Sequence, residues 1–213
     1  MPNSFNMFAA STSQVITRTV SDSWTWYLIR ASGLTAITLL VLLMFFGIGH
    51  ITGWTYRLVS PVRAWAIHKA MAIMLALSVT VHIVMLLFDH YERFTIAQLF
   101  IPFLRNYSNG TTFLGIPMTY LAIPLGIAAL YSTYIVTLSS LDTVGWIKRH
   151  KKLWQVTHFL SYVSILFALV HVVGAGTDFK ETGWKLLALA AFVVILGATV
   201  ARLLRANIFS RTS

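Results

Sequence analysis

Four of the seven histidines lie inside long apolar segments of this 213-residue chain, at His68, His82, His158 and His171. Imidazole is a common metal ligand and also transfers protons near neutral pH. Ionisable side chains are rare and costly inside membrane-spanning helices, so histidines there indicate a functional site. The first two are fourteen residues apart and the last two thirteen. The near-equal spacings predict two similar sites.

Five apolar segments are long enough to position these histidines within a membrane, whose hydrocarbon core of roughly 30 Å takes about 20 helical residues to cross. Hydrophobic residues make up 57% of the chain and charged residues 10%, against about 25% charged in a typical soluble domain. The alternating segments of a membrane β-barrel are not present. We therefore predict an all-α integral membrane protein, a bundle of five transmembrane helices at Tyr27–Gly49, Ala64–Phe88, Gly115–Leu138, Leu153–Gly176 and Trp184–Ala201.

The segments outside these helices divide the chain into three parts. Residues 1–26 form a polar N-terminal segment, 27–204 the membrane domain and 205–213 a short cytoplasmic tail. The apolar run that follows residue 26 is too long for a signal-peptide core, so we expect it to be retained. The longest connection, 89–114, contains an uncharged stretch at 94–104. We expect this stretch to lie on the membrane surface or to fold over the bundle.

The charge distribution predicts the orientation of the bundle. Sixteen Lys and Arg against six Asp and Glu give a net charge of +10, which in so apolar a chain indicates topology and contact with lipid headgroups, not nucleic-acid binding. The positive-inside rule favours an N-terminus outside and a cytoplasmic C-terminus, in a bacterial cytoplasmic membrane. This orientation places one acidic residue, Asp142, on the cytoplasmic side with ten basic ones: Arg57, Arg63, Lys69, Lys148, Arg149, Lys151, Lys152, Arg202, Arg205 and Arg211.

The second and fourth predicted helices run in the same direction, so their histidines fall at matched depths. His68 and His158 lie near the cytoplasmic side, and His82 and His171 lie about 20 Å further out at 1.5 Å per residue. Two imidazole pairs arranged in this way suit two six-coordinate haems, which favour electron transfer over oxygen binding. The alternative is that the four side chains bond to backbone carbonyls or to each other in a packed bundle.

The angular positions of the histidines agree less well. An ideal helix places His68 and His82 within about 40° of one face, but it separates the directions of His158 and His171 by about 140°. We expect helix distortion, different approach angles or an unlike haem orientation to absorb this difference.

Basic residues close to these histidines are candidate partners for haem propionates. Arg30, in the outer end of the first helix, would pair with the outer haem, or else extend to the membrane interface. Arg57, Arg63 and Lys69 would serve the inner haem in the same way.

The remaining histidines are predicted to lie near the membrane surface. His50 and His150 fall at headgroup level, and His90 is a solvated interfacial residue, with metal binding as its alternative. The basic run at 148–152 is a positive-inside anchor, or else a docking surface for an acidic partner.

These segments resemble the ferric reductase-like transmembrane family, which includes NADPH oxidases, metalloreductases and the haem-binding membrane subunit of a bacterial methionine-sulfoxide reductase system. The resemblance covers about residues 27–204. It rests on His68–Leu77 with His82 and Leu87-Phe88, on Leu28–Ser32, and on Thr157-His158 with His171. It implies two b-type haems, the inner one bound by His68 and His158 and the outer one by His82 and His171. It also implies that electrons pass from NADPH through a flavin to the inner haem and then outward.

Two departures from the family pattern shape the expected function. The chain ends about nine residues after Leu204, without the family's flavin- and NADPH-binding domain, and it contains no Gly-rich nucleotide fingerprint. Leu86 stands where the oxidases carry a further histidine, which argues against superoxide production. We therefore favour an electron-transfer subunit of an oxidoreductase over a complete enzyme. Its donor would be a separate flavoprotein reductase or a quinol, and its acceptor would lie outside the cytoplasm.

Three other functions fit the same pattern. The first is a quinol-linked cytochrome b that anchors a dehydrogenase. The second is a proton or metal transporter with a histidine relay, although the five predicted spans contain no Asp or Glu. The third is a haem-free structural subunit.

Overall fold

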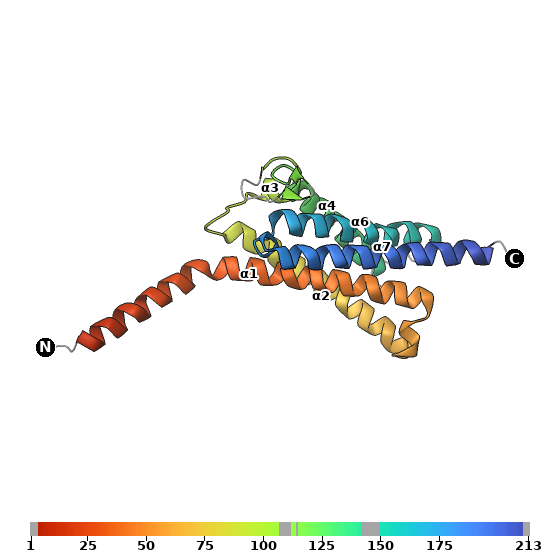
Figure 1. Ribbon diagram of the computed structural model, residues 1–213, viewed down its shortest axis with the longest axis horizontal. Coiled ribbons are helices and arrows are strands. Elements are labelled where there is room, and N and C mark those ends of the chain that lie inside the picture. Colours follow the sequence, from red (N-terminus) through yellow and green to blue (C-terminus); the bar gives the residue numbers. More distant parts are fainter. Residues whose placement is uncertain (1–3, 107–111, 114, 142–149, 211–213) are drawn as a thin grey trace.

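The structure is a computed structural model that describes residues 4–106, 112–113, 115–141 and 150–210, with side chains described between residues 23 and 200. Asp142, Lys148, Arg149 and Arg211 of the charge argument lie outside the described residues. The described part is mostly helical and contains five helices long and apolar enough to cross a membrane, as predicted (Figure 1). They are α1 (Ser4–Thr52), α2 (Pro61–Phe88), α4 (Ala122–Ser140), α6 (Lys151–Ala175) and α7 (Thr182–Ser210).

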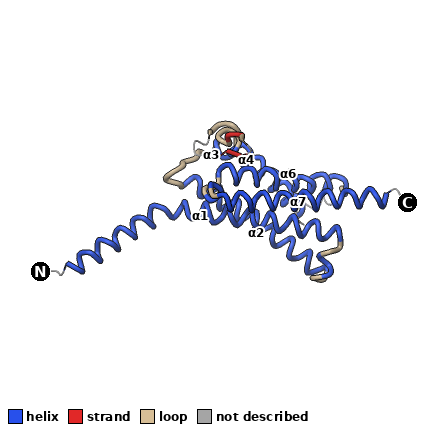
Figure 2. The backbone as a smooth tube through the Cα atoms, viewed as in Figure 1, coloured by secondary structure: helices blue, strands red, loops and turns tan. Residues whose placement is uncertain are grey.

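The long helices run along the long axis of the molecule and pack mainly in pairs (Figures 1 and 2). α1 pairs with α2, α4 pairs with α6, and α7 lies against α1 and α6. We call the two ends of the bundle the Asp89 end, where α2 finishes and α4 begins, and the Pro61 end, where α2 begins and α4 finishes. The buried core lies where α1, α2, α6 and α7 meet, and comprises Leu40, Leu43, Met44, Leu75, Ile165, Leu169, Val173, Phe179, Ala188 and Ile195.

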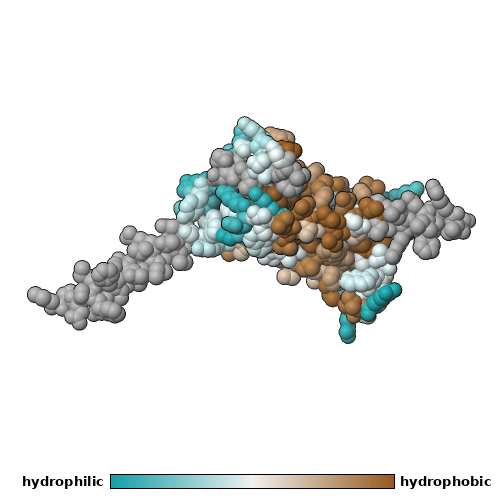
Figure 3. Space-filling model, in the orientation of Figure 1, coloured by the Kyte–Doolittle hydropathy of each residue, from teal (hydrophilic) through white to brown (hydrophobic). Residues whose placement is uncertain are grey.

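The outer surface of the bundle is apolar along the helices. Figure 3 shows hydrophobic residues over the middle of the molecule and hydrophilic residues gathered near its ends. Large side chains such as Met74 and Leu77 on α2, and Leu187 and Val193 on α7, are exposed. In water such a surface would be a large apolar patch, whereas in a bilayer it faces lipid.

Glycine and proline set the boundaries at the Pro61 end. Gly53 follows α1 with φ +74°, a left-handed conformation that ends a helix and that glycine adopts without steric strain. A short 3-10 helix, η1 (Thr55–Arg57), then leads to Pro61, which occupies the first turn of α2 where its missing N–H is harmless.

The third span begins later than the sequence predicts. A helix from Gly115 is wrong, because residues around it form a hairpin of β1 (Thr112–Phe113) and β2 (Ile116–Pro117). Gly115 has φ +80° in the turn of this hairpin, and the helix starts at Ala122. The first helix also extends further, because α1 is continuous from Ser4 through residues expected only to be polar.

The connection after α2 folds over the Asp89 end of the bundle, one of the two positions expected for it. A capping box between Thr95 and Gln98 starts α3 (Ile96–Phe100). Phe94 and Leu99 are buried. The hydroxyl of Tyr131 on α4 donates to the backbone carbonyl of Phe100 at 2.7 Å. These contacts fasten the connection to the bundle.

Candidate functional site: two histidine-lined cavities

Two cavities lie inside the bundle, and each receives one histidine from α2 and one from α6. His82 and His171 line the cavity towards the Asp89 end, which we call the His82 cavity. His68 and His158 line the cavity towards the Pro61 end, which we call the His68 cavity. The structure therefore brings together the same pairs that the sequence spacing predicts.

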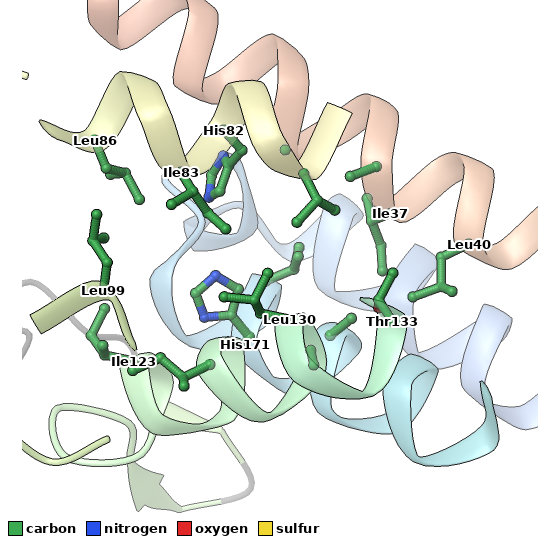
Figure 4. Close-up of a pocket in the computed structure, with 18 of the residues that line it drawn as sticks. Ile37, Leu40, His82, Ile83, Leu86, Leu99, Ile123, Leu130, Thr133 and His171 are labelled. Carbon is green, nitrogen blue, oxygen red and sulfur yellow. The ribbon is translucent and has the colours of Figure 1, made fainter. Parts of the chain in front are cut away.

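The His82 cavity is almost wholly apolar and has an empty volume of about 890 Å³, including space that opens to the surface. Figure 4 shows His82 and His171 pointing towards one another across it. Leu99 of α3 lies on one side of the two rings and Leu40 of α1 on the other (Figure 4).

Backbone carbonyls orient both rings of this cavity. Nδ1 of His82 lies 2.9 Å from the carbonyl oxygen of Ile29, and Nδ1 of His171 lies 2.6 Å from that of Ala122. A carbonyl only accepts hydrogen bonds, so each Nδ1 carries the proton and donates it. Each Nε2 then keeps its lone pair, which is how ligand histidines are oriented in metal sites.

A glycine one turn further along gives each ring access to its carbonyl. A Cβ atom at Gly33 would lie 3.2 Å from Cε1 and Nδ1 of His82, and one at Gly126 would lie 2.6 Å from Nδ1 of His171. Gly33 is four residues after Ile29, and Gly126 is four residues after Ala122. Residues four apart share one face of a helix, so a side chain at Gly126 would collide with the ring of His171, and one at Gly33 would press tightly against the ring of His82.

The His68 cavity is about twice as large, with an empty volume of about 1820 Å³. The ring centroids of His68 and His158 are 6.4 Å apart and their planes are tilted by 45°. Nδ1 of His158 lies 3.4 Å from Oγ of Ser140, and its ring stacks on Trp154 at 4.9 Å. A glycine again faces the α2 histidine, since a Cβ at Gly47 would lie 3.7 Å from His68.

A third histidine, His50, also lines the His68 cavity, which was not predicted from the sequence. Its ring centroid lies 5.5 Å from that of His68, and its ring stacks on Tyr56 at 5.6 Å. Its position at headgroup level stays a prediction. Both ring nitrogens of His50 are buried without a hydrogen-bond partner among the described residues. Nδ1 of His68 and Nε1 of Trp154 are also buried without a hydrogen-bond partner among the described residues. A histidine at the end of an apolar run is compatible with a position at the membrane interface and with a position inside the bundle. The sequence alone does not distinguish these two positions.

The unequal histidine spacing on α6 is accommodated without a break in the helix, which is continuous from Lys151 to Ala175. His158 approaches Ser140, at the last residue of α4, and His171 approaches Ala122, at its first. Both side chains therefore contact α4, at its opposite ends, and they reach cavities with largely different walls. The explanation of the angular difference stays a prediction.

The basic residues expected beside cofactors have varied surroundings. Arg30 pairs with Asp178 of η3 (Asp178–Lys180): its Nε donates to Oδ2 at 2.7 Å and its Nη2 donates to Oδ1. Its guanidinium also lies 4.8 Å from the ring centroid of Trp26. Lys69 lines the His68 cavity, whereas Arg63 is exposed in the first turn of α2 and is absent from the described walls of both cavities.

His90 is exposed just beyond the end of α2. Its Nδ1 lies 3.1 Å from the backbone carbonyl of Phe88, and it faces neither cavity among the described walls. No group of three or more His, Asp or Glu side chains converges on a metal-ion site within the described part of the chain.

Leu40, Leu75 and Thr133 line both cavities and therefore lie between them. All three are buried. The hydroxyl of Thr133 is 2.5 Å from that of Ser164 on α6, so its polar atom is satisfied within the partition.

The fold and the site define a class: a helical membrane bundle with two separate internal cavities, each lined by one histidine from α2 and one from α6. Comparisons with protein-family models, curated proteins and solved structures find no match. The functional argument therefore depends on the geometry of this chain.

We predict that Arg30 and Asp178 stabilise the fold as a pair. Arg30→Gln and Asp178→Asn should each lower the melting temperature in detergent, corresponding to about 1 kcal/mol since Arg30 is partly exposed. The double variant should be no less stable than the worse single one. Circular dichroism of all four proteins measures this, and strictly additive losses would contradict the pairing.

We also predict that Gly126→Val destabilises the bundle by about 2–4 kcal/mol, because the new side chain overpacks the interface and separates His171 from its carbonyl. Gly197→Val on α7 is the matched control, since a Cβ there meets nothing within 4 Å. Both changes alter helix propensity equally. Equal melting temperatures for the two variants would show that the space at Gly126 is not needed.

Proposed function

We propose that this chain is a dihaem b-type membrane cytochrome, the electron-transfer subunit of a larger redox system. The observation that carries the proposal is the repeated arrangement of one imidazole from α2 and one from α6 in each of two cavities stacked along the bundle. Haems bound there would supply one-electron transfer from one end of the bundle to the other.

The donor atoms and the apolar lining of the His82 cavity are compatible with this cofactor. His82 and His171 donate through Nδ1 to backbone carbonyls, which leaves both Nε2 atoms for an iron between the rings. Their mostly apolar surroundings suit a porphyrin, which is large and mainly apolar.

The spacing of the other pair gives independent support. Two imidazoles that bind one metal ion through bonds of about 2 Å hold their ring centroids roughly 6 Å apart. The corresponding separation of His68 and His158 is 6.4 Å. Within the His68 cavity, Lys69 is the cation available to a propionate.

In the proposed orientation the Pro61 end faces the cytoplasm of a bacterium and the Asp89 end faces outward, as the positive-inside rule favours. The electron donor, a flavoprotein reductase or a quinol, would act at the His68 cavity. The acceptor would lie beyond the His82 cavity. Arg30, held by Asp178, would stabilise the outward end of the bundle and not a propionate.

A histidine relay for protons or metal ions fits the arrangement less well. Such a relay needs ionisable or hydroxyl groups in succession between the two cavities. Of the three residues that line both cavities, two are leucines, and the hydroxyl of Thr133 is engaged by Ser164.

The first test is the optical spectrum of the purified chain. Dithionite-reduced minus oxidised spectra should show the bands of low-spin b-type haem, and quantification should give about two haems per chain because both iron positions are bis-histidine. A preparation without haem bands, from cells that supply haem, would refute the proposal.

Single variants test the assignment of the pairs. His82→Ala or His171→Ala should remove one haem and leave the other, because the two cavities are separate. His90→Ala, at an exposed histidine near the same end, should keep both. Haem content and redox titration of each variant distinguish these outcomes, and retention of both haems in His82→Ala would refute the ligand assignment.

A further inference from the structure

The His68 cavity contains more space and more unsatisfied polar groups than its counterpart. Its empty volume is about 1820 Å³ against about 890 Å³, although each cavity is lined by one pair of α2 and α6 histidines. Four buried side-chain nitrogens in this cavity have no described hydrogen-bond partner; they belong to His50, His68 and Trp154. Among the side chains described in the His82 cavity, none has a buried polar atom without a partner. Buried polar groups in folded proteins are nearly always paired, so these atoms indicate a missing ligand.

Two of these four nitrogens belong to His50, whose ring contacts that of His68. The ring of His50 lies against both His68 and Tyr56, and both of its nitrogens are buried. A neutral imidazole carries one N–H donor and one lone pair. It therefore satisfies a carbonyl oxygen by donating to it, and a hydroxyl by accepting from it.

The part of the cavity beside His50 reaches the surface of the bundle through apolar and aromatic residues. Ile51, Tyr56 and Trp65 line the cavity and are 60%, 42% and 51% exposed. Tyr and Trp at the end of a membrane bundle sit at headgroup depth. A ligand that enters here comes from the lipid phase and meets flat aromatic walls.

We propose that the His68 cavity has a second binding site, formed by His50 and Tyr56, for the headgroup of a lipid-soluble quinone or quinol. The planar ring stacks among the aromatic side chains, and one ring oxygen bonds to His50 in either oxidation state. This inference rests on the proposed function, because it assigns the electron donor to the quinol class and places it next to the inner histidine pair.

Quinone binding to the full-length protein in detergent tests the site directly. Menadione is a suitable probe because the chain has no cysteine to which it would add. Saturable quenching of tryptophan fluorescence, above that in empty micelles, reports binding. His50→Leu should weaken menadione binding roughly tenfold or more, since it removes the buried hydrogen bond. His50→Asn, which keeps a donor and an acceptor, should bind more tightly than His50→Leu.

His90→Leu is the matched control and should bind menadione like the unaltered protein. Haem content, measured on the same samples, should be unchanged in all three variants. Failure of the unaltered protein to bind menadione saturably, or equal affinity in His50→Leu, would overturn the quinone site while leaving the haem proposal intact. Loss of a haem in His50→Leu would also overturn it, by assigning His50 to the cofactor. Absence of haem from every sample would instead refute the proposed function, whatever menadione does.

Discussion

An imidazole inside an apolar bundle has no water to satisfy its two nitrogens, and the arrangement of this structure depends on that constraint. A helix interior offers only carbonyl oxygens, which are normally covered by the side chain one turn later. At Ile29 and Ala122 the covering position is a glycine, and a histidine from a neighbouring helix donates to the carbonyl. The same solution occurs on α1 and α4, two helices with unrelated sequences at these positions.

The two cavities differ in whether backbone carbonyls hold their histidine rings. In the His82 cavity both rings are fixed by backbone, which preorganises their Nε2 atoms. In the His68 cavity a Cβ at Gly47 would make only ordinary contact with His68, and Nδ1 of His68 has no described partner. One cavity therefore holds a pair of oriented imidazoles, and the other leaves buried polar groups without a described partner.

The sequence predicts the levels of the histidines along the bundle well and their lateral neighbours poorly. The spacings of His68 with His82 and of His158 with His171 fix two levels, because the rise per residue of a helix is constant. The partner of Arg30 is Asp178, 148 residues away, and no one-dimensional pattern relates the two. The contacts of His50 with His68 and Tyr56 were not predicted for the same reason, since they depend on how η1 and Tyr56 pack against the end of α1. The start of the third span was also misjudged, because the hairpin around Gly115 is nearly as apolar as a helix.

The partition formed by Leu40, Leu75 and Thr133 has a consequence for the membrane as an insulator. A continuous file of water molecules through both cavities would offer ions a path along the bundle. Two of the three partition residues are leucines, and the one hydroxyl, on Thr133, already bonds to Ser164, so the partition offers such a file few hydrogen-bonding partners. If the proposed haems occupy the two cavities, electrons would tunnel across this hydrocarbon partition, whereas hydrated protons would not, so the same side chains would pass one kind of charge and hold back the other.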